Sequence, residues 1–235
     1  MASETRARSQ LTARDPAWPP HDTEESVLGT DLHQAAITNL RWGINEAAQI
    51  GLAVGQHAPW RAYSQTALLG CRRPEGSLYR TYPDVFVHTR PLDRTRGSTV
   101  IATDGPPALI IEILSEATYE ADLDLDRGKG WSYADAGVRE YLTLDQTGCF
   151  AGEPLRAWRF ADGRYQPWLP EADGRCHSAT IGVAFALEDD ELIVYTRDGR
   201  RMLREGEVEE ERSRLRAEYE EEIARLRRLL DERSE

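Results

Sequence analysis

Residues 106–118 read PPALIIEILSEAT. Within this stretch, residues 108–114 are apolar except for Glu112, which is typical of a strand buried on both faces of a sheet. Burying an unpaired carboxylate costs several kcal/mol or more, so a proton, a buried cation or a metal ion must compensate Glu112. The stretch therefore predicts an internal strand of an α/β domain. Glu112 is then either a site residue or half of a structural ion pair with a buried arginine.

Helical and strand patterns alternate around this strand. Apolar residues at three- and four-residue steps predict a helix from Asp31 to about Ile50. A second helix is predicted from about Asp126 to Ala136, where Gly137 fits the helix end. Asp-Gly pairs between aromatic residues predict β-hairpins over residues 150–200. Further strands are predicted at residues 61–69, 78–87, 98–101 and 139–145.

The composition predicts one domain with two appendages. Residues 1–27 are polar with three prolines, and we expect a disordered or loosely ordered arm. Residues 28–200 form the expected domain. Residues 205–235, rich in Glu, Arg and Leu, predict one long charged helix. Its apolar stripe fits a short coiled coil that pairs two chains into a homodimer, or a helix docked on its own domain; the stripe comprises Leu215, Tyr219, Ile223, Leu226 and Leu230.

The charge balance limits the partners of the chain. It has 29 basic and 41 acidic residues, a formal net charge of −12, which argues against a generally basic nucleic-acid coat. The net charge does not exclude a local basic patch, for which the candidate residues are Arg72, Arg73, Arg90, Arg94 and Arg96. No apolar run approaches the roughly 20 residues needed to cross a bilayer, and the N-terminus lacks an apolar signal region. Three scattered cysteines suit a reducing compartment, so we expect a cytoplasmic protein.

A second carboxylate and one unusual cation join Glu112 as candidates. Asp84 follows Pro83 at the start of a predicted strand, and residues 89–107 are long enough to let that strand lie beside Glu112. Two carboxylates with a backbone carbonyl between them suit Mg²⁺ or Mn²⁺. Lys129 is the only lysine among 29 basic residues, and it could bring a compact charge to the same place. These are the parts needed to hydrolyse a phosphodiester.

An alternative metal motif is excluded by its spacing. Asp122, Asp124 and Asp126 alternate like the start of an EF-hand loop. The sixth position of such a loop would be Arg127 instead of glycine, and the twelfth would be Tyr133 instead of glutamate. We therefore predict no calcium loop here.

Several linked strings resemble the Uma2 family of the PD-(D/E)XK restriction-endonuclease-like superfamily. They are PDVFV at 83–87, PPALIIEILSEAT at 106–118, Lys129 followed by Tyr133, and AGVREYLTLD at 136–145. The resemblance covers about residues 24–195. It implies a restriction-endonuclease-like core, a mixed β-sheet flanked by helices, here with a β-hairpin region and a long C-terminal helix. It also implies a metal-dependent endonuclease that acts on DNA.

The resemblance assigns roles residue by residue. It implies that Asp84 and Glu112, helped by the Ile113 carbonyl, hold the metal, and that Lys129 stabilises the transition state. The superfamily motif has a lysine two residues after the glutamate, and this chain has Leu114 at that position. Uma2-like chains carry the lysine on the next helix instead, four residues before a tyrosine.

Lys129 and Tyr133 keep this spacing, although the chain has three extra residues before Lys129, and Tyr133 would orient or support that lysine. Glu46 is a candidate upstream acid. His33 matches the family's first-helix histidine and is left outside the catalytic set. The rival interpretation is a non-catalytic binding or oligomerisation protein on a nuclease-derived fold.

Overall fold

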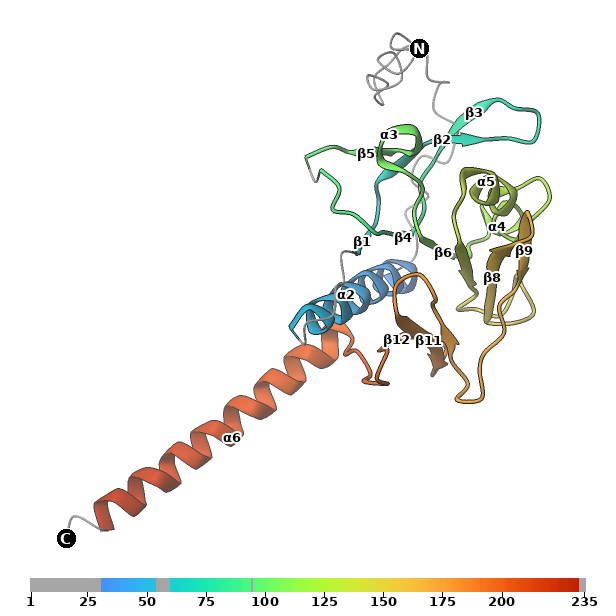
Figure 1. Ribbon diagram of the computed structural model, residues 1–235. Helices are drawn as coiled ribbons and strands as arrows, with labels where there is room; N and C mark the ends of the chain where they lie inside the picture. The colour runs from blue at the N-terminus through green and yellow to red at the C-terminus, as the bar shows by residue number, and fades with distance from the viewer. Residues whose placement is uncertain (1–30, 54–59, 94, 233–235) are drawn as a thin grey trace. The chain divides into compact units, whose positions relative to one another are not determined.

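The computed structural model describes residues 31–53, 60–93 and 95–232. The predicted arm at residues 1–27 lies outside them. The chain divides after Met202 into two compact units, which are described separately below. The first carries the sheets and the second carries the C-terminal helix (Figure 1).

A mixed six-stranded sheet forms the centre of the first unit. Its strand order is β1-β4-β6-β7-β8-β9, in which β6 and β7 are parallel and the other neighbours are antiparallel. This arrangement, flanked by helices, confirms the predicted fold class. The strands are β1 (Arg61–Tyr63), β4 (Val85–His88), β6 (Leu109–Ile113), β7 (Glu140–Leu144), β8 (Leu155–Ala161) and β9 (Arg164–Pro167).

Two three-stranded sheets complete this unit, and they correct two predicted strands. The sheet β3-β2-β5 contains β2 (Ala67–Arg72), β3 (Leu78–Thr81) and β5 (Ser98–Val100), which is followed by the short helix α3 (Ile101–Asp104). The sheet β10-β11-β12 contains β10 (Cys176–His177), β11 (Val183–Glu188) and β12 (Glu191–Thr196).

The single strands predicted at 61–69 and 78–87 are therefore wrong, because each is split between two sheets. Gln65 breaks the first with a left-handed φ of 54°. Pro83, which has no N–H to donate to a sheet, lies in the break of the second.

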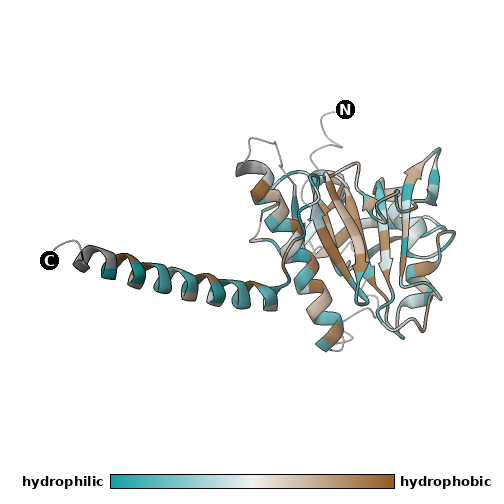
Figure 2. Ribbon diagram, turned by 90° about the horizontal axis from the view of Figure 1, so that it is seen from below, coloured by the Kyte–Doolittle hydropathy of each residue, from teal (hydrophilic) through white to brown (hydrophobic). Residues whose placement is uncertain are grey.

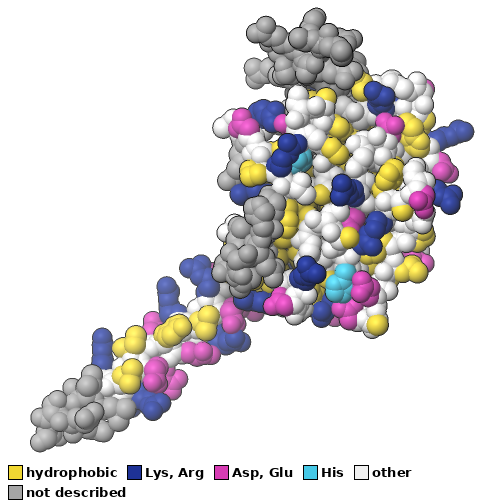
Figure 3. All heavy atoms as spheres, in the orientation of Figure 1, with side chains coloured by type: hydrophobic (Ala, Val, Ile, Leu, Met, Phe, Trp, Pro, Cys, Tyr) yellow, Lys and Arg dark blue, Asp and Glu magenta, His cyan; other side chains and the backbone are white. Residues whose placement is uncertain are grey.

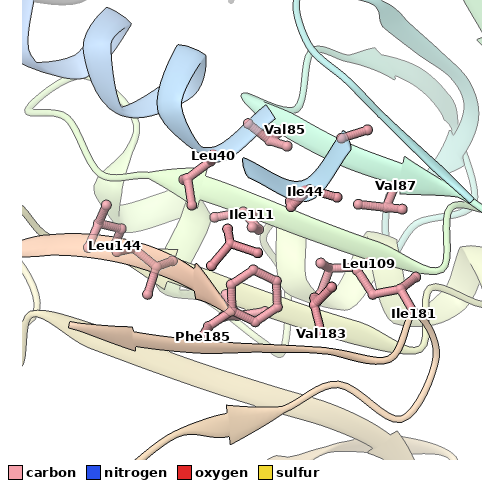
Figure 4. Close-up of a cluster of buried hydrophobic side chains, with 14 of the residues drawn as sticks. Leu40, Ile44, Val85, Val87, Leu109, Ile111, Leu144, Ile181, Val183 and Phe185 are labelled. Atoms are coloured by element: carbon pink, nitrogen blue, oxygen red, sulfur yellow. The ribbon is translucent and has the colours of Figure 1, made fainter. Parts of the chain in front are cut away.

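Helix α2 (Asp31–Ala53) covers one face of the central sheet. Its apolar stripe is buried, as the three- and four-residue spacing predicts, and Leu40 and Ile44 lie against Val85 and Ile111 in the close-up of Figure 4. Because side chains alternate along a strand, Val85 and Val87 face this helix while Phe86 belongs to a second cluster. Several strands near the middle of this unit are brown, and therefore apolar, in Figure 2.

Two short helices pack against the cluster of Phe86. They are α4 (Tyr119–Leu123) and α5 (Lys129–Ala136), and Tyr133 of α5 is fully buried there with Phe86 and Ile110. The sequence predicted α5 three residues too early and missed α4, because five polar-rich residues are too few to show a helical period. Gly137 ends α5 with a φ of 90°, as its position predicted.

Asp145 fixes the loop that follows β7. Its carboxylate accepts main-chain N–H bonds from Thr147 (3.2 Å), Phe150 (2.8 Å) and Ala151 (2.8 Å). Burial acts to raise the pKa of Asp145, but these hydrogen bonds outweigh burial and lower it below its usual value.

Replacing Asp145 by asparagine should therefore reduce the free energy of unfolding by about 1–3 kcal/mol at neutral pH. The folded-state pKa of Asp145 is depressed, so its contribution is present above the unfolded-state pKa and is lost as the pH falls through the folded-state value. Urea unfolding of parent and variant, from pH 7 down to the acid limit of folding, should show their difference shrink. A difference that stays constant across this range would contradict the prediction.

Helix α6 (Glu205–Glu232) makes up nearly all of the described part of the second unit. It matches the predicted C-terminal helix as far as the described residues extend, and Figure 2 shows it mostly hydrophilic. Among the described residues, no helix is long and apolar enough to cross a membrane.

Candidate active site

The pairing of β4 with β6 places Asp84 beside Glu112. Val85 pairs with Ile111 in this antiparallel ladder, so the residues one step further along each strand meet at its end. The Asp84 main-chain N donates to Glu112 Oε2 at 3.2 Å, and the Ile113 N donates to Asp84 Oδ2 at 2.8 Å. The two acids that the sequence singled out, 28 residues apart, thus form one hydrogen-bonded pair.

The two carboxylates differ in their burial. Asp84 lies before the first residue of β4, and 19% of its side chain is exposed, whereas only 2% of the Glu112 side chain is exposed. Glu112 shares its strand face with Ile110, the face that α5 covers. Burial raises the pKa of Glu112 well above its usual value, and the neighbouring Lys129 ammonium opposes this rise.

Helix α5 brings Lys129 and Tyr133 to Glu112. Residues four apart lie on the same face of a helix, so both side chains reach the same carboxylate. Lys129 Nζ is 3.5 Å from Glu112 Oε1, and the Tyr133 hydroxyl donates to that oxygen at 2.5 Å. Burial raises the pKa of Tyr133 well above its usual value, which keeps the hydroxyl protonated as a donor. Asp84, Glu112 and Lys129 therefore converge in the structure.

Asp122 is a member of this cluster that the sequence reasoning missed. Its side chain is buried on α4, with Oδ1 3.0 Å from Lys129 Nζ, and its Oδ2 accepts the Thr118 hydroxyl at 2.6 Å. Burial raises the pKa of Asp122, and Lys129 opposes that rise. Asp122 is the first acid of the excluded EF-hand pattern, but that pattern gives no indication that it contacts Lys129. Thr118 and Asp122 are four residues apart, which places them on one face of a helix, but the sequence analysis did not predict α4.

The glycines on either side of Lys129 have a steric explanation. A Cβ on Gly128 would lie 2.3 Å from the carbonyl oxygen of Ala121, and a Cβ on Gly130 would lie 2.5 Å from the side chain of Leu125. At Gly128 only glycine allows this approach to the backbone of α4, whereas at Gly130 a larger residue would require the Leu125 side chain to move. These glycines therefore allow Lys129 to lie opposite Asp122.

His33 is the contribution of helix α2 to the site. Its Nε2 lies 3.1 Å from Asp84 Oδ1, so His33 and the Ile113 N–H engage different oxygens of one carboxylate. The hydrogen bond to Asp84 raises the pKa of His33 against the opposing effect of burial. Glu46 lies roughly 20 Å further along this helix, at 1.5 Å per residue, and is exposed, so the structure does not place it in the cluster.

The cation beside Glu112 is Lys129, so the alternative of an ion pair with a buried arginine is wrong for Glu112, whereas Glu140 on the neighbouring strand pairs with a partly exposed arginine. Glu140, fully buried on β7, is 3.3 Å from Arg159 and also accepts the Ala179 N–H at 2.8 Å and the hydroxyls of Ser178 and Thr180 at 2.5 Å. Its oxygens are committed to these internal bonds. The cation at Glu112 is a lysine, so the two buried acids have different surroundings.

Four of the five arginines of the predicted basic patch are described, and all four are exposed. Arg90 donates to the main-chain carbonyl of Asp104, and Arg96 pairs with the Asp104 carboxylate at 2.9 Å. Arg94 lies outside the described residues. On the face drawn in Figure 3, the dark-blue side chains are scattered between acidic and apolar ones.

The chemistry of the donor atoms determines whether the cluster suits a divalent cation. Within the described ranges, no three His, Cys, Asp or Glu side chains are grouped so as to hold a metal. Asp84 and Glu112 nevertheless offer hard carboxylate oxygens beside each other, and Glu112 shares Lys129 with a third acid, Asp122.

Thr143 pairs with Glu112 across β6 and β7, and its buried hydroxyl has no hydrogen-bond partner among the described residues. An acidic oxygen site with few protein ligands fits Mg²⁺ or Mn²⁺, because Mg²⁺ usually keeps several of its waters.

Comparison with known proteins identifies the family. The family model of Uma2, described as "Putative restriction endonuclease", matches residues 25–218. The chain therefore belongs to the Uma2 family, whose fold is that of the PD-(D/E)XK superfamily, and the family description indicates a nuclease with DNA as its substrate. No curated protein and no solved structure matches the chain.

Proposed function

We propose that this protein is a metal-dependent endonuclease that hydrolyses DNA phosphodiester bonds. The observation that carries the proposal is the convergence of Asp84, Glu112 and Lys129 from β4, β6 and α5 within hydrogen-bonding or ion-pairing distance. Family membership supports the same reaction class.

Asp84 and Glu112 would hold Mg²⁺ or Mn²⁺, together with the main-chain carbonyl of Ile113. The N–H of Ile113 already binds Asp84 Oδ2, so that peptide lies at the pair. Glu112 Oε1 is shared by Tyr133 and Lys129, whereas Oε2 accepts the Asp84 N–H. A bound cation of this kind polarises a phosphoryl oxygen and acidifies a water molecule. The orienting hydrogen bonds keep both carboxylates in fixed directions for such a ligand.

Lys129 would stabilise the negative charge that develops on the phosphoryl group. Its amine lies beside Glu112 with 7% of the side chain exposed, so the charge acts in a poorly solvated place where electrostatic interactions are stronger than in water. A lysine is a compact point charge, whereas arginine is a wide planar fork. This difference gives a physical reason for a lysine at this one position of an arginine-rich chain.

Metal removal provides the direct test. The purified protein should convert supercoiled plasmid to nicked or linear DNA in Mg²⁺ or Mn²⁺, and EDTA should return the rate to background because the carboxylates alone cannot activate water. Added Mg²⁺ in excess of EDTA should restore cutting. If neither single- nor double-stranded DNA is cut with either ion, the endonuclease proposal is wrong.

The second candidate function, oligomerisation, is favoured by one surface of helix α6. Leu215, Tyr219, Ile223 and Leu226 are 39–67% exposed and follow steps of four, four and three residues. Yellow side chains lie along the helix in Figure 3 among dark-blue and magenta ones. Such a stripe stabilises a helix by packing against a partner.

We propose a second copy of the chain as that partner, in a short parallel coiled coil. In such a pair, flanking residues five positions apart face each other across the seam. With Ile223 and Leu226 in the seam, this places Glu222 opposite Arg227 of the second copy. The combination is attractive, so these charges complement the apolar stripe.

Replacing Ile223 by glutamate should disrupt this pairing. A charge in the seam should weaken association at least about tenfold, and sedimentation equilibrium at micromolar concentration should then report the mass of one chain. Ala217→Glu is the matched control, because it adds the same charge on the opposite side of the helix and should keep the dimer. A parent protein that is monomeric throughout this concentration range would contradict the proposal.

A further inference from the structure

Both carboxylate oxygens of Asp122 are engaged inside the protein. Oδ2 accepts the Thr118 hydroxyl at 2.6 Å, and Oδ1 faces Lys129 Nζ at 3.0 Å. Thr118 is itself 3.1 Å from the hydroxyl of Ser115, and the Asp122 main-chain carbonyl accepts the Tyr141 hydroxyl at 2.7 Å. These bonds fix α4 against β7 and give the carboxylate one orientation.

The amine of Lys129 lies between two acids and is nearer to Asp122. The distances are 3.0 Å to Asp122 Oδ1 and 3.5 Å to Glu112 Oε1. A lysine side chain has four rotatable bonds and takes its direction from the groups that bind its ammonium. Without Asp122, Glu112 would be the nearest acid to the ammonium among the described residues, and the ammonium would be drawn onto the carboxylate that is proposed to bind the metal.

We propose that Asp122 is a positioning residue for Lys129. It holds the ammonium beside Glu112 without letting it close onto that carboxylate, so that the acid stays available to a divalent cation and the positive charge stays available to the phosphate. This inference rests on the proposed nuclease function for its catalytic consequence. Its structural content, the anchoring of Lys129, is independent of activity.

The chain's single lysine makes the anchoring measurable. In protein labelled with ¹³C,¹⁵N-lysine, every side-chain lysine signal comes from Lys129. A buried, hydrogen-bonded ammonium exchanges its protons slowly, so its N–H signal should be visible in the parent. Asp122→Asn should shift this signal and speed its exchange at least about tenfold. The same variant should lower the maximal nicking rate about 10- to 100-fold, as losses of orienting partners do.

Matched variants separate positioning from a general loss of structure. Asp135→Asn removes the same charge from an exposed position on α5 and should leave both readouts unchanged. Asp122→Glu, which restores the charge, should recover part of the nicking rate. Thr118→Val keeps Asp122 and removes only the hydroxyl that holds it. This variant should change the Lys129 N–H signal less than Asp122→Asn does. If Asp122→Asn does not fold, the Thr118→Val variant tests whether Asp122 positions Lys129.

The two proposals fail in distinguishable ways. If the parent cuts no DNA, the nuclease proposal is wrong, and the lysine signal still tests Asp122. If Asp122→Asn leaves the Lys129 signal and its exchange as in the parent, the positioning role is wrong even where nicking falls. A normal nicking rate in a folded Asp122→Asn protein overturns it as well.

Discussion

Replacing Asp84 by asparagine or Glu112 by glutamine is expected to reduce Mg²⁺-dependent plasmid nicking by about 10³-fold, equivalent to several kcal/mol of transition-state stabilisation. Each substitution removes one of the two negative charges proposed to hold the cation while keeping the size of the side chain. Asparagine at position 84 can still accept the Ile113 N–H that Asp84 Oδ2 accepts now. The loss should therefore come from cation binding and not from collapse of the strand end.

Two measurements accompany this prediction. Calorimetric titration with Mn²⁺ should show heat for the parent and none for either variant, because both lose a carboxylate ligand. Asp135→Asn, exposed on α5, controls for the change of charge. If one folded variant nicks plasmid at the parental rate, the substituted residue is not part of the site. If both variants do so, the proposal that these carboxylates hold the metal is wrong.

Replacing Lys129 by methionine is expected to lower the free energy of unfolding by about 3–5 kcal/mol, because it leaves buried carboxylates without their cation. The side chains of Asp122 and Glu112 are 1% and 2% exposed, so water cannot take the place of the ammonium. For a chain of this size the melting temperature should fall by about 10 °C. Thermal unfolding followed by circular dichroism measures this change, and nicking should be lost in the same variant.

Lys129→Arg is the matched comparison for this substitution. It keeps the positive charge, so most of the stability should return. Its planar fork is larger than an ammonium and cannot occupy the same point between the two acids, so nicking should stay low. If Lys129→Met melts at the parental temperature, the ion pairs of Lys129 with Asp122 and Glu112 do not stabilise the packing of α4 and α5.

The comparison of Glu112 with Glu140 shows why burial alone does not define a site. Both are buried glutamates on neighbouring strands of one sheet. Glu140 is surrounded by donors from Arg159 and residues 178–180, which suits a structural role. Glu112 instead accepts the Asp84 main-chain N–H and shares Lys129 with Asp122, and this group of carboxylate oxygens suits a divalent cation.

Local sequence was sufficient for the elements with a strong period or a strong stop signal. The run 108–114 contains β6, because continuous apolarity fits a strand covered on both faces, and the stripe of α2 is buried as its spacing requires. The conformation of Gly137 ends α5 where predicted. Sequence patterns failed at 61–69 and 78–87, because the assignment of each half to a separate sheet depends on distant partners.

The sequence by itself determined the fold class, the unusual acid Glu112, the paired candidate Asp84 and the singular Lys129. These are local properties: an acid in an apolar run, an acid after proline, and one lysine among arginines. Tertiary structure alone decided that Asp122 faces Lys129 and that His33 reaches Asp84, because each pair joins different elements. Such contacts depend on close helix packing at Gly128 and Gly130 and on the position of α2 against the sheet, which no local spacing encodes.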